Sequence, residues 1–194
     1  EETGFIKMQT ETGFHWTFGR EKVWYCASLI IGDTIADGRK AKGEVCFSVE
    51  AGSLYAIAPY AYYGNHQITR VILPEGLKEI GAFAFCGCTQ LCEVVIPDSV
   101  ERIGESAFEK CSQLLIFSSA ASVIGNRAFA LCEKLRFVWL PRISVISKES
   151  FFHCSSLETL EIMQLKRMEQ GCLKECIQLK SFALDSVKEI GEET

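Results

Sequence analysis

The sequence predicts a β-rich α/β solenoid, in which short repeated units stack around a shared hydrophobic core. Three observations support this fold class. One motif recurs at intervals of 21 to 23 residues, its apolar residues have the spacing of short strands, and a Pro or Gly interrupts the apolar pattern in most copies. Because a unit of this size cannot bury its own apolar face, the units must stack to form a core.

The repeat is clearest from Ile80, where the chain reads I-G-A-F-A-F-C-G-C-T-Q-L. Similar segments are spread along the chain, and their first residues are Ile57 in a degenerate copy, then Ile80, Ile103, Ile124, Ile146, Met168 and Ile190. We expect residues 45–194 to form the solenoid, with about six repeats. The last copy is truncated, so we expect the natural protein to be longer.

A single unit illustrates the expected local structure. Leu91 begins a segment with the L-x-x-V-x-I spacing of a short strand, and Pro97 ends it because proline lacks the N–H that a strand ladder needs. Gly104 then turns the chain without the penalty of a Cβ atom. The following segment, 107–111, is predicted to form a short helical turn that directs Phe108 into the interior.

Residues 1–44 do not follow the period. They contain Trp16, Trp24 and apolar runs at 14–18 and 29–31. The first unit of a solenoid has no neighbour to cover its core, so terminal units are usually atypical. We therefore predict an irregular N-terminal cap of short strands over 1–44.

The consensus P-x-x-V-x-x-I-G-x-x-A-F-x-x-C-x-x-L closely resembles that of the BspA-like leucine-rich repeat family, over about residues 45–190. The resemblance implies a right-handed superhelix with a parallel sheet on its concave side. It also implies a microbial protein, at the cell surface or secreted, that takes part in adhesion. Two units depart from the pattern: the unit from Leu114 lacks its Pro and two residues, and the unit from Met168 has Cys172-Leu173 in place of Ala-Phe.

Composition excludes several classes of protein. With 48% apolar and 23% charged residues, the chain has the composition of a soluble globular protein. A formal charge of −5 and the lack of any Lys/Arg-rich run argue against nucleic acid as a partner. No apolar stretch approaches the roughly 20 residues that a membrane-spanning helix needs, so we expect no direct membrane insertion.

Five of the ten cysteines occupy one position in successive units: Cys88, Cys111, Cys132, Cys154 and Cys176. Asn65 holds this position in the degenerate copy, and both residue types can hydrogen-bond backbone groups of a turn. We expect a column of buried, free thiols. Rungs of a parallel sheet are about 4.8 Å apart, which exceeds the roughly 3.8 Å between Cβ atoms of a disulfide.

The remaining cysteines are less clearly placed. Cys26, Cys46, Cys86 and Cys92 lie outside the column, and their redox state is open. Cys86 and Cys92 are expected to be exposed, where a local disulfide or a dimer contact is an alternative. The C-x-x-x-C pairs at 88–92 and 172–176 are four units apart and cannot share one ion, so no metal site is expected.

Nothing in the sequence indicates an enzyme. His15, His66 and His153 are scattered, and adjacent residues such as His153 and Cys154 usually diverge in a turn. The chain lacks G-x-S-x-G, G-x-G-x-x-G and P-loop motifs. We therefore expect no catalytic residue and no cofactor.

A binding surface is predicted on the concave face, between the buried strand positions. Phe137 and Trp139 lie side by side there, and a contiguous exposed apolar patch often marks an interaction site, with Trp enriched at binding hot spots. An incidental surface is the alternative. Residues two and four past the Leu position of each unit form two exposed rows on this face. The candidate ligand-binding residues in these rows are Phe137, Trp139, Ile116, Val95, Ile72, Arg70, Glu93, Thr159 and Glu161, and the same counting places Ser118, Ser181 and Ala183 there.

These observations favour a non-catalytic protein-interaction module. Its partner is expected to be a protein, such as a host or matrix protein, or a glycan. The surface or secreted location is implied by the family resemblance alone. Three alternatives remain. They are a cytoplasmic scaffold or regulatory repeat protein, which unpaired thiols would suit, a spacer region of a larger protein, and part of an enzyme whose catalytic domain lies outside this chain. The oligomeric state is open.

Overall fold

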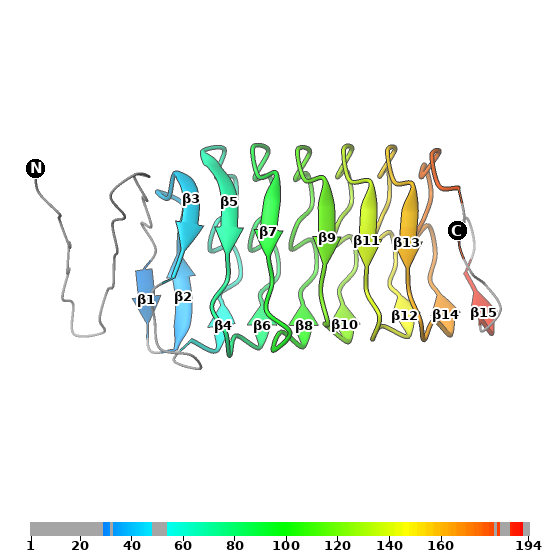
Figure 1. The fold of residues 1–194 in the computed structure, drawn as a ribbon, viewed down its shortest axis with the longest axis horizontal. Coiled ribbons are helices and arrows are strands. Elements are labelled where there is room, and N and C mark those ends of the chain that lie inside the picture. The colour runs from blue at the N-terminus through cyan, green and yellow to red at the C-terminus, as the bar shows by residue number, and fades with distance from the viewer. Residues whose placement is uncertain (1–28, 32, 48–53, 181, 183–186, 192–194) are drawn as a thin grey trace, which may run out of the picture.

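The computed structural model describes residues 29–31, 33–47, 54–180, 182 and 187–191. Within these residues the chain forms stacked coils in one elongated array, with β1 and β2 at one end and β15 at the other (Figure 1). The predicted cap segments before residue 29, with Trp16, Trp24 and His15, lie outside the described residues. The boundary at 44/45 stays a prediction.

Short strands of two to five residues are the only regular elements in the described part of the chain. They are β1 (Leu29–Ile31), β2 (Thr34–Asp37), β3 (Gly43–Cys46), β4 (Ala56–Ile57), β5 (Ile68–Ile72), β6 (Glu79–Ile80), β7 (Glu93–Val95), β8 (Arg102–Ile103), β9 (Ile116–Ser118), β10 (Val123–Ile124), β11 (Phe137–Trp139), β12 (Val145–Ile146), β13 (Thr159–Glu161), β14 (Arg167–Met168) and β15 (Glu189–Ile190).

Successive coils pair in parallel and build two long faces (Figure 1). One face contains the sheets β3-β5-β7 and β9-β11-β13, and we call it the sheet face. The other contains β1-β2-β4-β6-β8-β10 followed by β12-β14-β15. Every pair is parallel except β1 with β2. The predicted parallel-sheet solenoid is therefore confirmed.

The two faces are interrupted at different coils. On the sheet face the break falls between β7 and β9, and on the other face between β10 and β12. Both breaks flank the unit that begins at Leu114, the one that is short by two residues. Its β9 pairs with β11, and its β10 pairs with β8. On the sheet face the short coil therefore pairs with the coil that follows it, and on the other face it pairs with the coil that precedes it.

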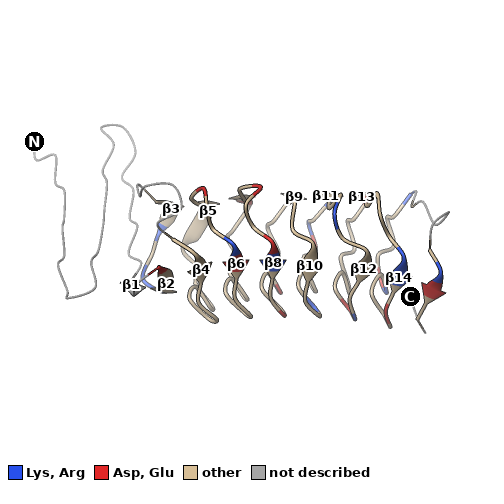
Figure 2. Cartoon of the chain, turned by 90° about the horizontal axis from the view of Figure 1, so that it is seen from below, with Lys and Arg blue, Asp and Glu red and all other residues tan. Residues whose placement is uncertain are grey.

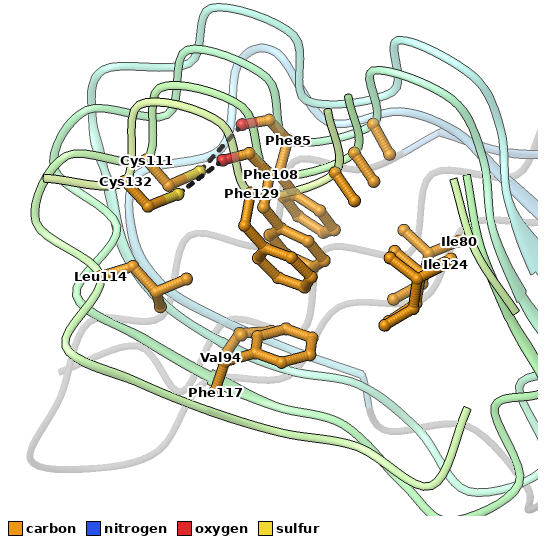
Figure 3. Close-up of a cluster of buried hydrophobic side chains, with 14 of the residues drawn as sticks. Ile80, Phe85, Val94, Phe108, Cys111, Leu114, Phe117, Ile124, Phe129 and Cys132 are labelled. Carbon is orange, nitrogen blue, oxygen red and sulfur yellow. Dashed lines mark hydrogen bonds between the residues drawn. The ribbon is translucent and has the colours of Figure 1, made fainter. Parts of the chain in front are cut away.

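A ladder of aromatic rings forms the centre of the core (Figure 3). Phe85, Phe108 and Phe129 stack nearly parallel, with centroids 5.2 and 5.6 Å apart. Tyr62 and Phe151 extend the ladder at its two ends. All of these side chains are fully buried, and they are among the largest side chains of the core, so their burial contributes substantially to hydrophobic stabilisation.

The short coil compensates for its missing residues with a larger side chain. Phe117 takes the place that Val94 and Val138 have in the neighbouring coils. Its ring packs edge-on against Phe108 at 5.2 Å and Phe129 at 4.4 Å. The aromatic ladder therefore continues through the coil at which both sheets are interrupted.

The predicted helical turns are wrong, since the described residues contain no helix. Ser106 and Lys110 have left-handed φ angles of 50° and 62°, which a helix does not accept. Between them the N–H of Phe108 donates to Ala128 in the next coil, whereas that of Glu109 donates three residues back to Ser106. The segment is a run of tight turns whose alternate amides bond to the next coil.

Gly104 is required for a different reason from the one expected. Its φ is not positive, so backbone freedom is not the cause. A Cβ atom there would lie 2.5 Å from the backbone nitrogen of Ala82, one coil earlier. Gly81 and Gly125 meet the preceding coil in the same way. The Ile-Gly corner is therefore a point of close backbone contact between coils.

Candidate functional site

The structure places the candidate residues in two rows on the sheet face. The paired residues lie directly opposite one another on neighbouring strands. The first row contains Glu44, Arg70 and Glu93, then Ile116, Phe137 and Thr159. The second row contains Cys46, Ile72 and Val95, then Ser118, Trp139 and Glu161. Ser181 and Ala183 lie outside the described residues.

Apolar side chains gather in the middle of these rows. Ile116 is 59% exposed, Phe137 40%, Trp139 39% and Val95 40%. Phe117 and Val138, the alternating residues of the same strands, are buried in the core, so this pattern follows from the two-residue period of a strand. Solvent therefore reaches a cluster of apolar side chains that the fold itself does not use. We call these four residues the apolar patch.

An ion-pair network occupies the sheet face on β3, β5 and β7. Arg70 Nη1 lies 2.5 Å from Glu44 Oε1, and Arg70 Nε lies 2.7 Å from Glu93 Oε2. Hydrogen bonds to Glu93 and then to Glu44 raise the pKa of the Arg70 guanidinium. Because both carboxylates already engage it, Arg70 has little capacity left for a ligand.

A second ion-pair network borders the patch on the other half of the face. Glu158 accepts hydrogen bonds from Lys180 at 2.6 Å and from Arg136 at 2.7 Å. These cations, Lys180 first, lower the pKa of Glu158. The guanidinium carbon of Arg136 also lies 5.3 Å from the centre of the Phe137 ring, within the range of a cation–π contact.

Sequence counting found the two rows but missed this border. The residues that lie one position after the buried Leu of a unit, where the two rows use the second and fourth positions, include Leu115, Arg136 and Glu158. Leu115 is 45% exposed beside Ile116 and enlarges the apolar surface. The break in strand pairing between β7 and β9 was also missed, and it places Arg70, Ile72, Glu93 and Val95 in a different hydrogen-bonded sheet from the other candidates. The two aromatic candidates, Phe137 and Trp139, both lie on β11, in the β9-β11-β13 half.

Charges of both signs are spread along the opposite edge of the coils (Figure 2). Lys78 Nζ lies 2.8 Å from Glu101 Oε1, and the bond lowers the pKa of that carboxyl. Nη2 of Arg167, on β14, lies 3.0 Å from Oε1 of Glu169. Paired charges of this kind are typical of a solvated surface, so this edge offers no obvious site.

The thiols of the cysteine column are free, as predicted, and the first four are buried, whereas Cys176 is only half-buried. Cys111 donates through Sγ to the carbonyl oxygen of Phe85, and Cys132 donates to that of Phe108 (Figure 3). Burial raises the pKa of Cys88 to about 12 and that of Cys111 well above its ordinary value. These thiols stay protonated at neutral pH and are poor nucleophiles.

The expectation that Cys86 is exposed is wrong, whereas Cys92 is exposed as expected. Cys86 is 7% exposed, and Glu109 and Arg127 of the next two coils carry charges near its thiol. Burial, then the charge of Glu109, raises the pKa of Cys86. Cys26 lies outside the described residues, and the described cysteines other than Cys46 are free thiols.

The described residues contain no arrangement that suggests catalysis. Cys154 is buried and donates to Phe129, and His153 beside it has a left-handed φ of 57° in the turn. His66 Nδ1 lies 2.9 Å from Thr89 Oγ1 on the surface. No group of three or more His, Cys, Asp or Glu among these residues is arranged to hold a metal ion.

A search of the described residues for a helix long and apolar enough to cross a membrane finds none. Among curated proteins, none matches this chain. The family model described as "BspA type Leucine rich repeat region (6 copies)" matches residues 113–194.

Two solved structures are similar to this chain. A leucine-rich repeat protein from Bacteroides ovatus is 27% identical with a TM-score of 0.70, and the match covers 81% of this chain and 43% of that one. The T. pallidum leucine-rich repeat protein is 24% identical with a TM-score of 0.65, covering 81% of this chain and 77% of that one. This chain thus spans less than half of the Bacteroides protein. The family model matches residues 113–194 alone, and the fold of the described residues is similar to that of these two leucine-rich repeat proteins.

Proposed function

We propose that this chain is a non-catalytic protein-interaction module that binds a protein partner through the sheet face. The observation that carries the proposal is the apolar patch, in which Phe137 and Trp139 are each about two-fifths exposed on one strand. A strand that only faces water would carry polar side chains at these positions. Exposed apolar clusters are typical of interaction sites, and Trp is enriched among the residues that dominate binding.

The architecture supports the same function. Stacked repeats present an extended surface to a partner, and each coil adds a strand without changing its neighbours. Here the patch spans β7, β9 and β11, so a partner that covers it contacts several coils at once. Ion pairs on both sides of the patch, at Arg70 and at Glu158, give it the polar rim that protein interfaces usually have.

We place the module at a microbial cell surface or in a secreted protein, with adhesion to host or matrix proteins as its role. The support is the BspA-type repeat, since the fold alone does not specify location. Glycans remain a second class of ligand on the same face. The boundaries of 1–44 as a cap and 45–194 as the solenoid are part of this proposal.

The test is binding of the purified chain to a panel of matrix proteins, plasma proteins and glycans. The double variant Phe137→Ser/Trp139→Ser should lose saturable binding while its circular dichroism and melting temperature stay close to the parent's. A matched control is Val123→Ser/Met163→Ser, which removes two exposed apolar side chains from outside the patch. Equal binding by the parent and the Phe137/Trp139 variant would reject the site.

A specific observation favours an alternative function, a cytoplasmic scaffold. Eight of the described cysteines, all except Cys46, are free, and free thiols are usual in a reducing compartment. Fractionation of the producing cells, with surface biotinylation of intact cells, separates the two possibilities. Labelling of the chain in intact cells supports surface display, and labelling only after lysis supports the scaffold.

A further inference from the structure

The strongest unassigned chemistry on the sheet face lies around Trp139. Its register partners are Ser118 on β9 and Glu161 on β13. Trp139 and Glu161 are both exposed, on adjacent strands of one row. An indole ring therefore lies next to a carboxylate, at the spacing of neighbouring parallel strands, which is about 4.8 Å.

The two aromatic residues of the patch differ in what they already contact. Arg136 lies over the ring of Phe137 at 5.3 Å, so this ring is already engaged by a cation. No cation of the described residues lies over Trp139. Its indole has the most favourable face for a cation among aromatic side chains, and that capacity is unused within the described part of the chain.

The carboxylates of the sheet face also differ in whether a cation of the described residues already binds them. Glu44 and Glu93 are bound to Arg70, and Glu158 is bound to Arg136 and Lys180. The side chain of Glu161 has no ion pair or hydrogen bond with any residue that the structure describes. Glu161 is thus the carboxylate of the two rows that is available to an outside cation.

The net charge of the two rows also favours a cationic partner. Three carboxylates, Glu44, Glu93 and Glu161, stand against the single guanidinium of Arg70, which leaves a formal charge of −2. Complementary charge favours a basic partner and disfavours an acidic one. Ile116 and Val95, on the adjacent strands β9 and β7, provide the apolar surface beside this charge.

We infer that the sheet face recognises a protein segment with a basic side chain next to an apolar one. The ammonium or guanidinium group lies between the indole of Trp139 and the carboxylate of Glu161, and the apolar neighbour packs on Ile116. This inference rests on the proposed function, because it assigns the chemistry of the partner to the same face. It excludes an acidic segment, whose carboxylate would meet Glu161.

The experiment selects heptapeptides from a random phage library on the immobilised chain, with the variant Phe137→Ser/Trp139→Ser selected in parallel. Peptides that only the parent enriches should contain Lys or Arg beside an apolar residue. One such peptide, synthesised with a fluorophore, is then measured with Lys and with norleucine, which keeps the length of the side chain and removes the charge.

The parent should bind the Lys peptide about 5- to 10-fold more tightly than the norleucine peptide, the combined effect of an exposed cation–π contact and an exposed ion pair. Glu161→Gln should reduce this ratio to about 2-fold and should weaken its dependence on salt. Glu105→Gln, an exposed glutamate of the turn after β8 that causes the same change of charge, should leave the ratio unaltered.

The outcomes distinguish the two proposals. Peptides that require Phe137 and Trp139 but show no preference for Lys or Arg overturn the inference and leave the proposed function intact. An unchanged Lys preference in Glu161→Gln overturns it as well. If no peptide depends on Phe137 and Trp139, the proposed site is rejected and the inference with it.

Discussion

The thiol of Cys111 lies 3.2 Å from the carbonyl oxygen of Phe85 in the preceding coil. The same contact joins Cys88 to Tyr62 and Cys154 to Phe129. In every case the thiol donates across the coil boundary to the residue that carries the stacked ring. The cysteine column therefore couples each turn to the aromatic ladder beside it.

Asn65 performs this role at the first position of the column with more hydrogen bonds. Its amide donates to the carbonyl oxygens of Gly38 and Ala41, and its oxygen accepts from the amides of Gln67 and Ile68. We expect Asn65→Ala to lower the free energy of unfolding by about 2–4 kcal/mol, because it removes the partners of several buried groups.

Cys111→Ala is the matched comparison and should cost only about 1–2 kcal/mol, since sulfur is a weak donor and the Phe85 carbonyl keeps the Cys88 amide as a partner. Urea denaturation of both variants, followed by circular dichroism, measures the difference. Equal losses would show that filling the space, and not hydrogen bonding, decides which residue suits this position.

The aromatic ladder should be most sensitive at its centre. Phe108 contacts Phe85, Phe129 and Phe117, and it is fully buried. Phe108→Ala should therefore lower the free energy of unfolding by about 3–5 kcal/mol, through lost burial and a cavity that rigid neighbours cannot fill.

Phe137→Ala is the control for this prediction, because it removes the same ring from the surface. Its cost should stay below about 1 kcal/mol, the usual range for a surface substitution. Thermal melting and urea denaturation measure both variants. A Phe108→Ala protein as stable as Phe137→Ala would contradict the stacked arrangement.

Much of the fold could be predicted because the repeat constrains it. The strand positions, the interior Phe108 and the free thiol of Cys111 follow from residue type and period alone. So do the two exposed rows, since counting from each buried Leu places Phe137 and Trp139 on one surface. Repetition turns a weak local pattern into a strong one, because every unit must satisfy the same packing.

The errors arose where conformation depends on the neighbouring coil. The turn at Ser106 and Lys110 uses left-handed residues that are not glycine, and only the bonds to the next coil reveal it. Cys86 is buried by residues of later coils, so its own sequence context did not indicate this. The break between β7 and β9 follows from stacking a short unit on longer ones, which the sequence of one unit does not show.

The close contact at Gly104 gives a sharp prediction about the Ile-Gly corner. A Cβ atom there meets the backbone of Ala82 at 2.5 Å and that of Gly81 at 2.8 Å, and backbone atoms do not yield easily. Gly104→Ala should therefore lower the free energy of unfolding by about 2–3 kcal/mol, in the range of an overpacked core.

Gly87→Ala separates this effect from backbone conformation. Gly87 has a positive φ of 76°, but its added Cβ would contact the preceding coil only at 3.5 Å. Its cost should be about 1 kcal/mol, from the left-handed conformation alone. If Gly104→Ala has the same melting temperature as the parent, this corner can accommodate a Cβ atom, as the equivalent position does at Ser147.

Alkaline pH should destabilise the protein through the buried thiols of the column and of Cys172. Burial raises the pKa of Cys88, Cys172 and Cys176 to about 12, from an ordinary value of 9.0. A pKa that is higher in the folded state means that the folded protein keeps a proton which the unfolded chain loses. The stabilisation is therefore complete below about pH 9 and is lost as the pH rises from 9 towards 12.

Each such thiol should make the free energy of unfolding fall by about 1.4 kcal/mol per pH unit in this window. Cys111→Ser removes one of them, because a serine hydroxyl does not titrate there, while it keeps a donor for Phe85. Urea denaturation between pH 8 and pH 11 should show a shallower decline for Cys111→Ser than for the parent, even though the variant begins less stable. Parallel declines would mean that the thiol of Cys111 ionises as easily in the folded protein as in the unfolded chain, which its burial in the column argues against.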